Sequence, residues 1–457
     1  MKIDYQKLIQ DLDLKKFQCD LVDVRIEEST TTNILCQNGE LLQAVDNPTA
    51  GYFIRVFTRG QWFYEASTNF NQIEESIRKL IAFAETFPQA ESTFHGLKNN
   101  GNHHLVKYSK SRFDQVSMED KVNLVMKYQE LKSKINYVKE WRVRYTDIYK
   151  VKYYKNSLGT SFAYDFNQAG LSFNVVMKDG DNLFTDYEME YVSSFNQLLN
   201  LEEKFVNYFK EAEKFLHAET VTPGKYRVVL SPEIVGIFTH ESFGHKSEAD
   251  FMLGDKDALK EWQMGKQVGS PILSIVDSGA HENTSGYCPI DDEGTLAQKN
   301  YLIKDGILTG RLHSKHTADE LGELPTGNCR AMNFEWEPIV RMTSTYIEKG
   351  VDSFESILKK AGDGALFIDG AKHGTGGSTF TIAPTKAYLI ENGKLAKPLK
   401  ISLISGSVFE TLNLIEAIGD DFDLKSSAFG GCGKMSQWPL PVADGGPSIL
   451  VNGMQVS

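Results

Sequence analysis

The tripeptide Thr222-Pro223-Gly224 divides this chain into two parts with different sequence patterns. Before it, residues 195–218 have the spacing of a long, charge-rich helix, and directly after it residues 226–230 have the composition of a strand. Adjacent Pro and Gly residues end regular structure. A length of 457 residues leaves room for two or three domains. We therefore expect one domain over residues 1–220 and another over residues 221–457.

The two parts also differ in the elements that their patterns predict. Helical periodicity covers residues 2–17, 73–86 and 118–135, between strand-like segments, and Asn38-Gly39 is typical of a hairpin turn. The polar stretch 88–108 is expected to be a surface loop. The second part is richer in Gly and in strand patterns. The predicted fold class is α+β, with a mixed α/β N-terminal domain and a strand-rich C-terminal domain.

Composition excludes several classes of protein. The net charge of −12 disfavours binding to a phosphate backbone, so we expect no direct nucleic-acid contact. No apolar run approaches the roughly 18 residues of a membrane helix, and the first residues lack a signal-peptide core. We expect a cytoplasmic protein without membrane contact. The five cysteines form no CxxC pair and too sparse a set for a disulfide scaffold: Cys19, Cys36, Cys288, Cys329 and Cys432.

The segment after the first strand of the second part carries the chemistry. Ser231 and Pro232 suit the N-cap and first position of a helix, and this helix continues into His240-Glu241-Ser242-Phe243-Gly244-His245. Two histidines, with a glutamate beside the first, form the arrangement of zinc peptidases. In these enzymes the imidazoles bind the metal and the carboxylate is the general base. The C-terminal domain is thus expected to carry a metal-site helix.

The spacing of these histidines differs from that of HExxH. Residues five apart on a regular helix differ in direction by roughly 140°, so the pair can reach one ion only if the helix widens or ends between them. We therefore predict a departure from α geometry between His240 and His245, with Gly244 as the place that permits it. The alternative is that the two histidines are unrelated residues on a helix surface.

A third ligand has to come from elsewhere in the chain. Cys432 lies between glycines in the sequence Gly430-Gly431-Cys432-Gly433, which leave its thiol accessible, although a small buried cysteine in a tight turn has the same pattern. Other candidates are spread over the second part: Glu248, Asp250, His281, His313, His316 and His373.

Residues 240–245 resemble the HExxxH motif of the TldD/PmbA family, the so-called modulator of DNA gyrase metallopeptidases. The resemblance covers nearly the whole chain, more loosely in its N-terminal half, where it rests on Ile26-Glu27-Glu28, the Asn38-Gly39 hairpin and residues 66–69. Further motifs follow in the family's order, at residues 291–295 (DDEGT), 325–328 (PTGN), 341–346 (RMTSTY), 387–393 (AYLIENG) and 432–434 (CGK).

The resemblance implies roles for particular residues. TldD-type subunits keep the metal motif and PmbA (TldE)-type subunits have lost it, so this chain is similar to the TldD type. By that resemblance His240, His245 and Cys432 bind zinc, and Glu241 is the catalytic carboxylate. One departure is visible, because residues 372–377 (KHGTGG) replace a Gly-rich segment with Val-Asp. We expect this departure to leave the metal site alone and to affect substrate preference.

These expectations combine into a zinc-dependent peptidase for short or unfolded peptides, in which Glu241 activates a zinc-bound water. An extended peptide that adds to a strand edge would give broad specificity. The alternative is a non-catalytic binding or regulatory subunit whose structural metal site is closed by Glu248 or another histidine. A DNA-associated regulator is suggested only by the family's name. The resemblance also implies a homodimer or a heterodimer with a PmbA (TldE)-type subunit.

Overall fold

The first part of the chain is built on one sheet of long strands. The computed structural model describes residues 3–90 and 98–457. The seven-stranded sheet has the order β3-β2-β1-β5-β6-β4, with β7 paired to β6. Its strands are β1 (Leu21–Gln37), β2 (Glu40–Thr58), β3 (Gln61–Ser67), β4 (Asn102–Leu105), β5 (Val138–Asn156), β6 (Ser161–Asp179) and β7 (Asn182–Val192).

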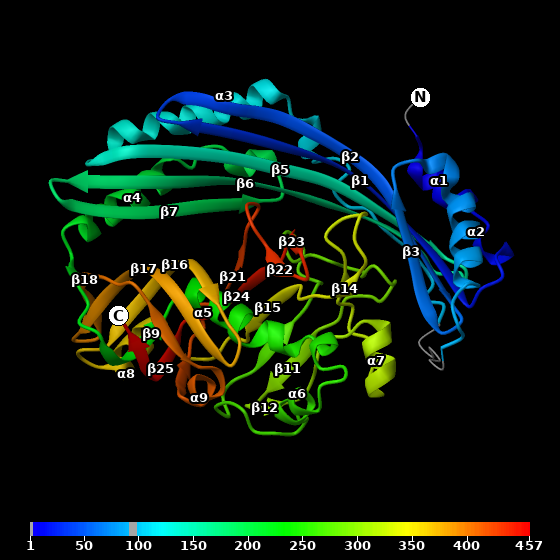
Figure 1. The fold of residues 1–457 in the computed structure, drawn as a ribbon. Helices are drawn as coiled ribbons and strands as arrows, with labels where there is room; N and C mark the ends of the chain where they lie inside the picture. The colour runs from blue at the N-terminus through cyan, green and yellow to red at the C-terminus, as the bar shows by residue number, and fades with distance from the viewer. Residues whose placement is uncertain (1–2, 91–97) are drawn as a thin grey trace.

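Helices cover this sheet at two places. α3 (Met118–Gln129) and α4 (Glu202–Leu216) pack on one end of it, where Trp141, Phe173 and Phe205 are fully buried in a shared core. α1 (Tyr5–Asp11) and α2 (Ile73–Ala84) pack at the opposite end, where a second core forms. The long strands arch over the second part of the chain, and α3 lies on the far side of the arch (Figure 1).

Two further sheets form the second part of the chain. The eight-stranded sheet consists of β8 (Glu219–Thr220), β9 (Gly224–Leu230), β16 (Leu366–Thr375), β17 (Thr379–Glu391), β18 (Lys394–Lys400), β19 (Ile404–Ser407), β20 (Ile415–Ile418) and β25 (Ile449–Val456). The six-stranded sheet consists of β10 (Ile275–Asp277), β11 (Asn300–Lys304), β12 (Ile307–Leu308), β15 (Ser344–Ile347), β21 (Asp423–Ser426) and β24 (Ala443–Gly446).

Helix α5 (Pro232–Thr239) lies between these two sheets and contacts β16, β15 and β24. Its residues Ile234, Val235 and Phe238 are fully buried, which fixes the direction in which the helix enters the next turn. The remaining elements are β13 (Cys329–Arg330), β14 (Ile339–Val340), β22 (Cys432–Lys434), β23 (Gln437–Leu440), α6 (Lys256–Glu261), α7 (Lys315–Leu321), α8 (Phe354–Ala361) and α9 (Val408–Asn413).

The structure confirms the α+β class and the Asn38-Gly39 hairpin, which joins β1 to β2. It shortens the first predicted helix, because α1 ends at Asp11 and only a 3₁₀ turn at Leu14–Lys16 follows. The predicted loop 88–108 was wrong in part, since β4 pairs with β6 within it, while residues 91–97 lie outside the described residues. Among the described residues, no helix is long and apolar enough to cross a bilayer.

Buried ion pairs join the sheet to the second part of the chain. Asp292 accepts hydrogen bonds from Lys152 Nζ at 2.9 and 3.0 Å, and it lies 3.3 Å from Arg25 Nη1. Its neighbour Glu293 pairs with Arg55 at 3.1 Å. Burial opposes ionisation of Asp292, but the two cations outweigh it and hold the pKa of this carboxyl below its usual range. The ion pairs of the DDEGT motif therefore hold the seven-stranded sheet against the second part of the chain.

We expect Asp292→Asn to lower the free energy of unfolding by about 3–5 kcal/mol at pH 7, since it leaves two buried cations without their partner. The folded-state pKa of Asp292 is depressed, so its contribution is complete above the unfolded pKa of about 3.9 and is lost as the pH falls below it. Urea unfolding at pH 7 and at pH 3 measures this difference, which should shrink at the lower pH.

The matched control is Glu416→Gln, which removes an exposed ion pair with Arg227. Exposed pairs contribute about 0–1 kcal/mol. If Asp292→Asn cost no more than this control at pH 7, the ion pairs would not hold the arch in place.

Candidate metal centre

The two histidines of the motif lie on a turn that is wider than an α-helix. Ser231 caps α5 by accepting a hydrogen bond from the Ile234 amide at 3.4 Å, and α5 continues as a π-helical turn (η6, His240–Gly244). The wider turn brings His240 and His245 to the same side, with ring centroids 5.1 Å apart. The predicted departure from α geometry is confirmed.

Gly244 serves this turn in a different way from the one expected. Its φ of −56° and ψ of −53° are ordinary helical values, which any residue adopts. A Cβ atom at this position would overlap Sδ of Met342. The glycine is therefore needed for space against Met342 and not for backbone freedom.

The structure brings Cys432 to the two histidines across 187 residues of sequence. Cys432 opens β22, and its Sγ lies 3.4 Å from Nε2 of His245. One donor atom from each of His240, His245 and Cys432 lies within 4.8 Å of the others. Arg341 Nη2 donates to the Cys432 carbonyl oxygen at 2.7 Å, and a Cβ at Gly431 would overlap the Leu440 carbonyl. This turn is therefore held closely in place.

The three groups strongly affect one another's ionisation. Burial raises the pKa of the Cys432 thiol, but the two imidazoles outweigh it and hold this pKa well below its usual range. Burial lowers the pKa of both histidines, yet the thiol raises that of His240 to about 9, and the thiol with Glu248 raises that of His245 to about 10. A thiolate beside two imidazoles is a donor set that zinc prefers, so these residues fit the metal.

Two carboxylates lie behind the imidazoles. The fully buried Glu248 accepts a hydrogen bond from His245 Nδ1 at 3.2 Å and lies 3.2 Å from Lys434 Nζ, two residues beyond Cys432. Asp444 Oδ2 lies 3.9 Å from His240 Nδ1. Carboxylates in such positions orient metal-binding imidazoles. Glu248, which the sequence also offered as a ligand or as the group that closes the site, instead supports His245.

Glu241 lies beside this donor group, on a cavity of about 250 Å³ that His240 and Asp444 also line. Residues 372–377, which were predicted to leave the metal site alone, pack against Glu241. A Cβ at Gly376 would overlap the Glu241 carbonyl oxygen, and one at Gly374 would lie 3.0 Å from Glu241 Cγ. These glycines shape the backbone around Glu241, which is outside the donor group, so the expectation for the metal ligands stays a prediction.

The other sequence candidates lie outside the donor group. Asp250 pairs with Lys434 at 2.6 Å, and His313 contacts Glu323 at 2.8 Å. The His281 ring packs edge-on against Tyr346 at 5.2 Å. Sequence reasoning missed the roles of Lys434, Asp444 and Gly376, whose positions depend on packing between distant segments.

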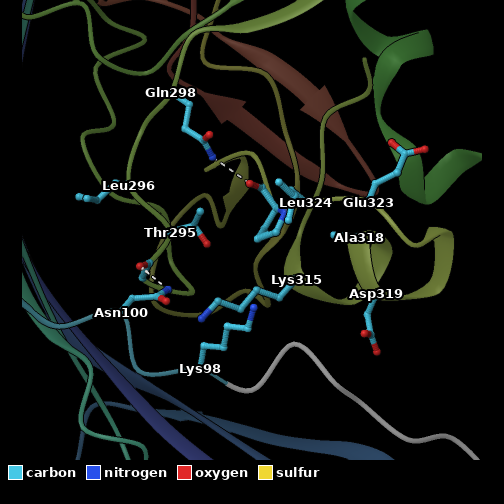
Figure 2. A pocket seen from close by; sticks show the side chains of 12 residues that line it. Lys98, Asn100, Thr295, Leu296, Gln298, Lys315, Ala318, Asp319, Glu323 and Leu324 are labelled. Carbon is cyan, nitrogen blue, oxygen red and sulfur yellow. Dashed lines mark hydrogen bonds between the residues drawn. The ribbon is translucent and has the colours of Figure 1, made fainter. Parts of the chain in front are cut away.

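A larger cavity of about 520 Å³ lies elsewhere, between Lys98, Asn100 and the residues around α7. Figure 2 shows Asn100 and Gln298 in hydrogen bonds with backbone carbonyls at its wall, which are those of Gly294 and Pro325. None of the residues predicted to act on a substrate or a metal lines this cavity.

Three family descriptions match successive segments of the chain. They are the PmbA/TldA metallopeptidase domain 1 over residues 22–86, the central domain over residues 111–218 and the C-terminal domain over residues 223–457. The segments in the third description include all four predicted site residues.

Individual relatives agree with these matches. A metalloprotease of Synechocystis is 33% identical over 96% of this chain and 95% of that protein. A zinc metalloprotease TldD homolog of Saccharolobus solfataricus is 30% identical over 89% of each chain.

Solved structures share the fold. TldE from Thermococcus kodakarensis matches with a TM-score of 0.79 and 16% identity over 98% of this chain and all of that one. A Thermotoga maritima protein, named for a link to DNA gyrase, matches with a TM-score of 0.79 and 22% identity over 96% of each chain.

Proposed function

This chain belongs to the PmbA/TldA metallopeptidase family, and we propose that it is a zinc-dependent peptidase that cleaves short or unfolded peptides with Glu241 as its proton carrier. One observation carries the proposal. Two imidazoles and a thiolate place their donor atoms within 4.8 Å of one another, and one of these residues, His240, lines the same cavity as Glu241. A metal-binding group and a free carboxylate thus face the same space.

The residues of the chain divide the work in this proposal. His240, His245 and Cys432 would hold the metal, while Glu248 orients the His245 imidazole and Asp444 lies 3.9 Å from His240 Nδ1. When bound, zinc supplies Lewis acidity, which lowers the pKa of water and polarises a carbonyl.

Glu241 is outside the donor group and therefore keeps its oxygens for proton transfer. It accepts a proton from the attacking water as the new C–O bond forms. It then delivers this proton to the leaving amine as the C–N bond breaks.

An open site distinguishes this function from the alternative, a regulatory subunit with a structural metal. Structural zinc sites are closed by four protein ligands, whereas catalytic sites use three. Within residues 3–90 and 98–457, the donor group contains three residues. Glu248 Oε2 contacts His245 Nδ1 and Lys434, and Glu248 is not one of the three residues of the donor group. These contacts favour the peptidase.

Further parts of the proposal concern the molecule as a whole. We propose that it acts in the cytoplasm, on peptides and not on nucleic acid, and that it folds as domains over residues 1–220 and 221–457. We also propose a dimer, either of this chain with itself or with a PmbA (TldE)-type subunit.

Metal removal tests the proposed function. Purified protein should contain about one zinc ion per chain, and it should cleave an unstructured peptide. A chelator should abolish cleavage and added zinc should restore it, because the apolar cores are large enough for the chain to stay folded without the ion. Elemental analysis and chromatography of the peptide products measure both on one sample. Full cleavage by metal-free protein, or bound zinc without any cleavage, would refute the proposal.

A further inference from the structure

The cavity beside Glu241 follows one face of α5 and of the π-helical turn η6 that continues it. Glu233, Ile237 and Glu241 succeed one another at four-residue intervals, which places them on the same helix face, and all three line the cavity. Eight helical residues rise by roughly 12 Å. The cavity thus has a metal end, at Glu241 and His240, and a far end, at Glu233, where Glu188 of β7 joins the wall.

The middle of this cavity is suited to an aliphatic chain. Ile237 on α5, Met189 on β7 and Val442 supply apolar wall, and the rings of Tyr187 and Tyr208 complete it. Lys and Arg side chains bury their methylene stems along such surfaces while their charged ends reach polar groups.

Within the described residues, the two carboxylates at the far end have no paired cation, although Lys425, which pairs with Asp423, also lines the cavity. Glu233 Oε1 accepts only from neutral donors, the Tyr187 hydroxyl at 3.4 Å and the Ala371 amide at 3.2 Å. Within the described residues, neither Glu188 nor Glu233 forms an ion pair. The lysines nearest to Glu188 each pair with another carboxylate, in the pairs Lys425–Asp423 (2.7 Å), Lys386–Asp186 (2.7 Å) and Lys204–Glu190.

Ionisation of these carboxylates is correspondingly unfavourable. Burial, and then the charge of Glu233, raise the pKa of Glu188 to about 7, although Lys204, Lys386 and Lys425 oppose the shift. Burial and Asp369 raise the pKa of Glu233, which is opposed by Lys425 and Lys386. A cation that entered the far end would stabilise both carboxylates in their charged form.

The metal end also has a polar group without a partner. Nδ1 of His240 has no hydrogen-bond partner in the described part of the chain, and the side chain is 6% exposed. Its neighbour Asp444 lies 3.9 Å away on the cavity wall. Both ends of the cavity therefore present buried polar groups that a ligand can satisfy.

We propose that the far end of this cavity, at Glu188 and Glu233, binds a cationic group of the peptide substrate, either a Lys or Arg side chain or a free α-amino group. The proposal rests on the proposed peptidase function, because it assumes that peptides occupy the space beside Glu241. The enzyme would then prefer cationic peptides. The sequence-based expectation, in which a peptide adds to a strand edge, included no such preference.

Binding measurements test this preference without relying on cleavage. The protein is full-length, zinc-loaded Glu241→Gln. The parent probe is a neutral ten-residue peptide. In two series of derivatives, a single Lys, or its uncharged analogue norleucine, occupies each position in turn. Every peptide is prepared once with a free and once with an acetylated amino terminus. At the preferred position, the Lys peptide should bind about tenfold more tightly than the norleucine peptide. If the α-amino group is the cation, acetylation should produce the tenfold loss instead.

Variants then locate the site. Glu188→Gln and Glu233→Gln should each reduce the tenfold ratio, and the double variant should bring it to within about twofold of unity. Glu219→Gln is the control, because it makes the same chemical change at an exposed ion pair with Lys397 and Glu219 does not line the cavity. It should leave the ratio unchanged. Circular dichroism establishes that each variant is folded.

A second measurement uses no variant at the far end. Raising the salt concentration should weaken only the cationic peptides, because an ion pair is screened and apolar contact is not. Equal affinity for all peptides, or a preference that survives in both far-end variants, would overturn the proposal. Absence of cleavage by the unmodified protein would instead refute the peptidase function. The binding comparison could still be interpreted in that case, because it does not depend on cleavage.

Discussion

Glu241→Gln should lower the turnover of a peptide substrate by about 100- to 10,000-fold, the range typical of a lost general base, while zinc stays bound at one ion per chain. The reason is that Glu241 lies outside the donor group formed by His240, His245 and Cys432. Glutamine keeps the shape of the side chain but cannot accept the proton. Peptide cleavage under saturating substrate and elemental analysis of the same sample measure the two quantities.

Glu219→Gln is the matched control, since it makes the same chemical change at an exposed ion pair with Lys397. It should retain full turnover. If Glu241→Gln lost zinc together with activity, Glu241 would be a ligand or a support for one, and the proposed division of roles would be wrong.

Cys432→Ser should weaken zinc binding by at least about 100-fold, which equals or exceeds the loss caused by removing an outer-sphere partner. A serine hydroxyl remains protonated near neutral pH and is a poor ligand for zinc, whereas the pKa of the Cys432 thiol is held well below its usual range by two imidazoles. Folding should be largely retained, because Cys432 is one small residue of a large apolar core. Competition with a chromogenic chelator measures the affinity, and thermal unfolding measures stability.

Cys288→Ser separates this result from the effect of altering any buried cysteine. Cys288 is 2% exposed and its Sγ contacts the Ile290 carbonyl oxygen at 3.4 Å, away from the donor group. This control should keep its zinc. Retention of stoichiometric zinc and normal turnover by Cys432→Ser would mean that the third ligand is another residue.

The local parts of the site could be predicted from sequence. The Ser231 cap, the helix after it and the departure from α geometry before His245 all follow from rules that act over a few residues. The hairpin at Asn38-Gly39 and the α+β class are of the same kind. Strand length was less predictable, because pairing with β5 carries β1 through the polar segment between its two apolar runs.

The remaining features depend on contacts between distant segments. From the sequence, Gly244 was expected to relax the backbone. In the structure, Met342, nearly 100 positions later, occupies the space that a side chain at Gly244 would need. From the sequence, Glu248 was a candidate ligand, whereas in the structure it contacts Lys434. The pattern around Cys432 left both a ligand and a buried turn cysteine open, and the resemblance to a family favoured the ligand.

The arch of the N-terminal sheet has a consequence for which proteins this enzyme can destroy. β7 and α4 supply Tyr187 and Tyr208 to the wall of the cavity at Glu241, so the reacting bond is enclosed from above by a different part of the chain. We expect that a compact domain cannot enter a site enclosed in this way, whereas a single extended strand can. The proposed peptidase would therefore spare its folded neighbours and remove only chains that have lost, or have not yet gained, their structure, which makes the conformation of a target the signal for its degradation.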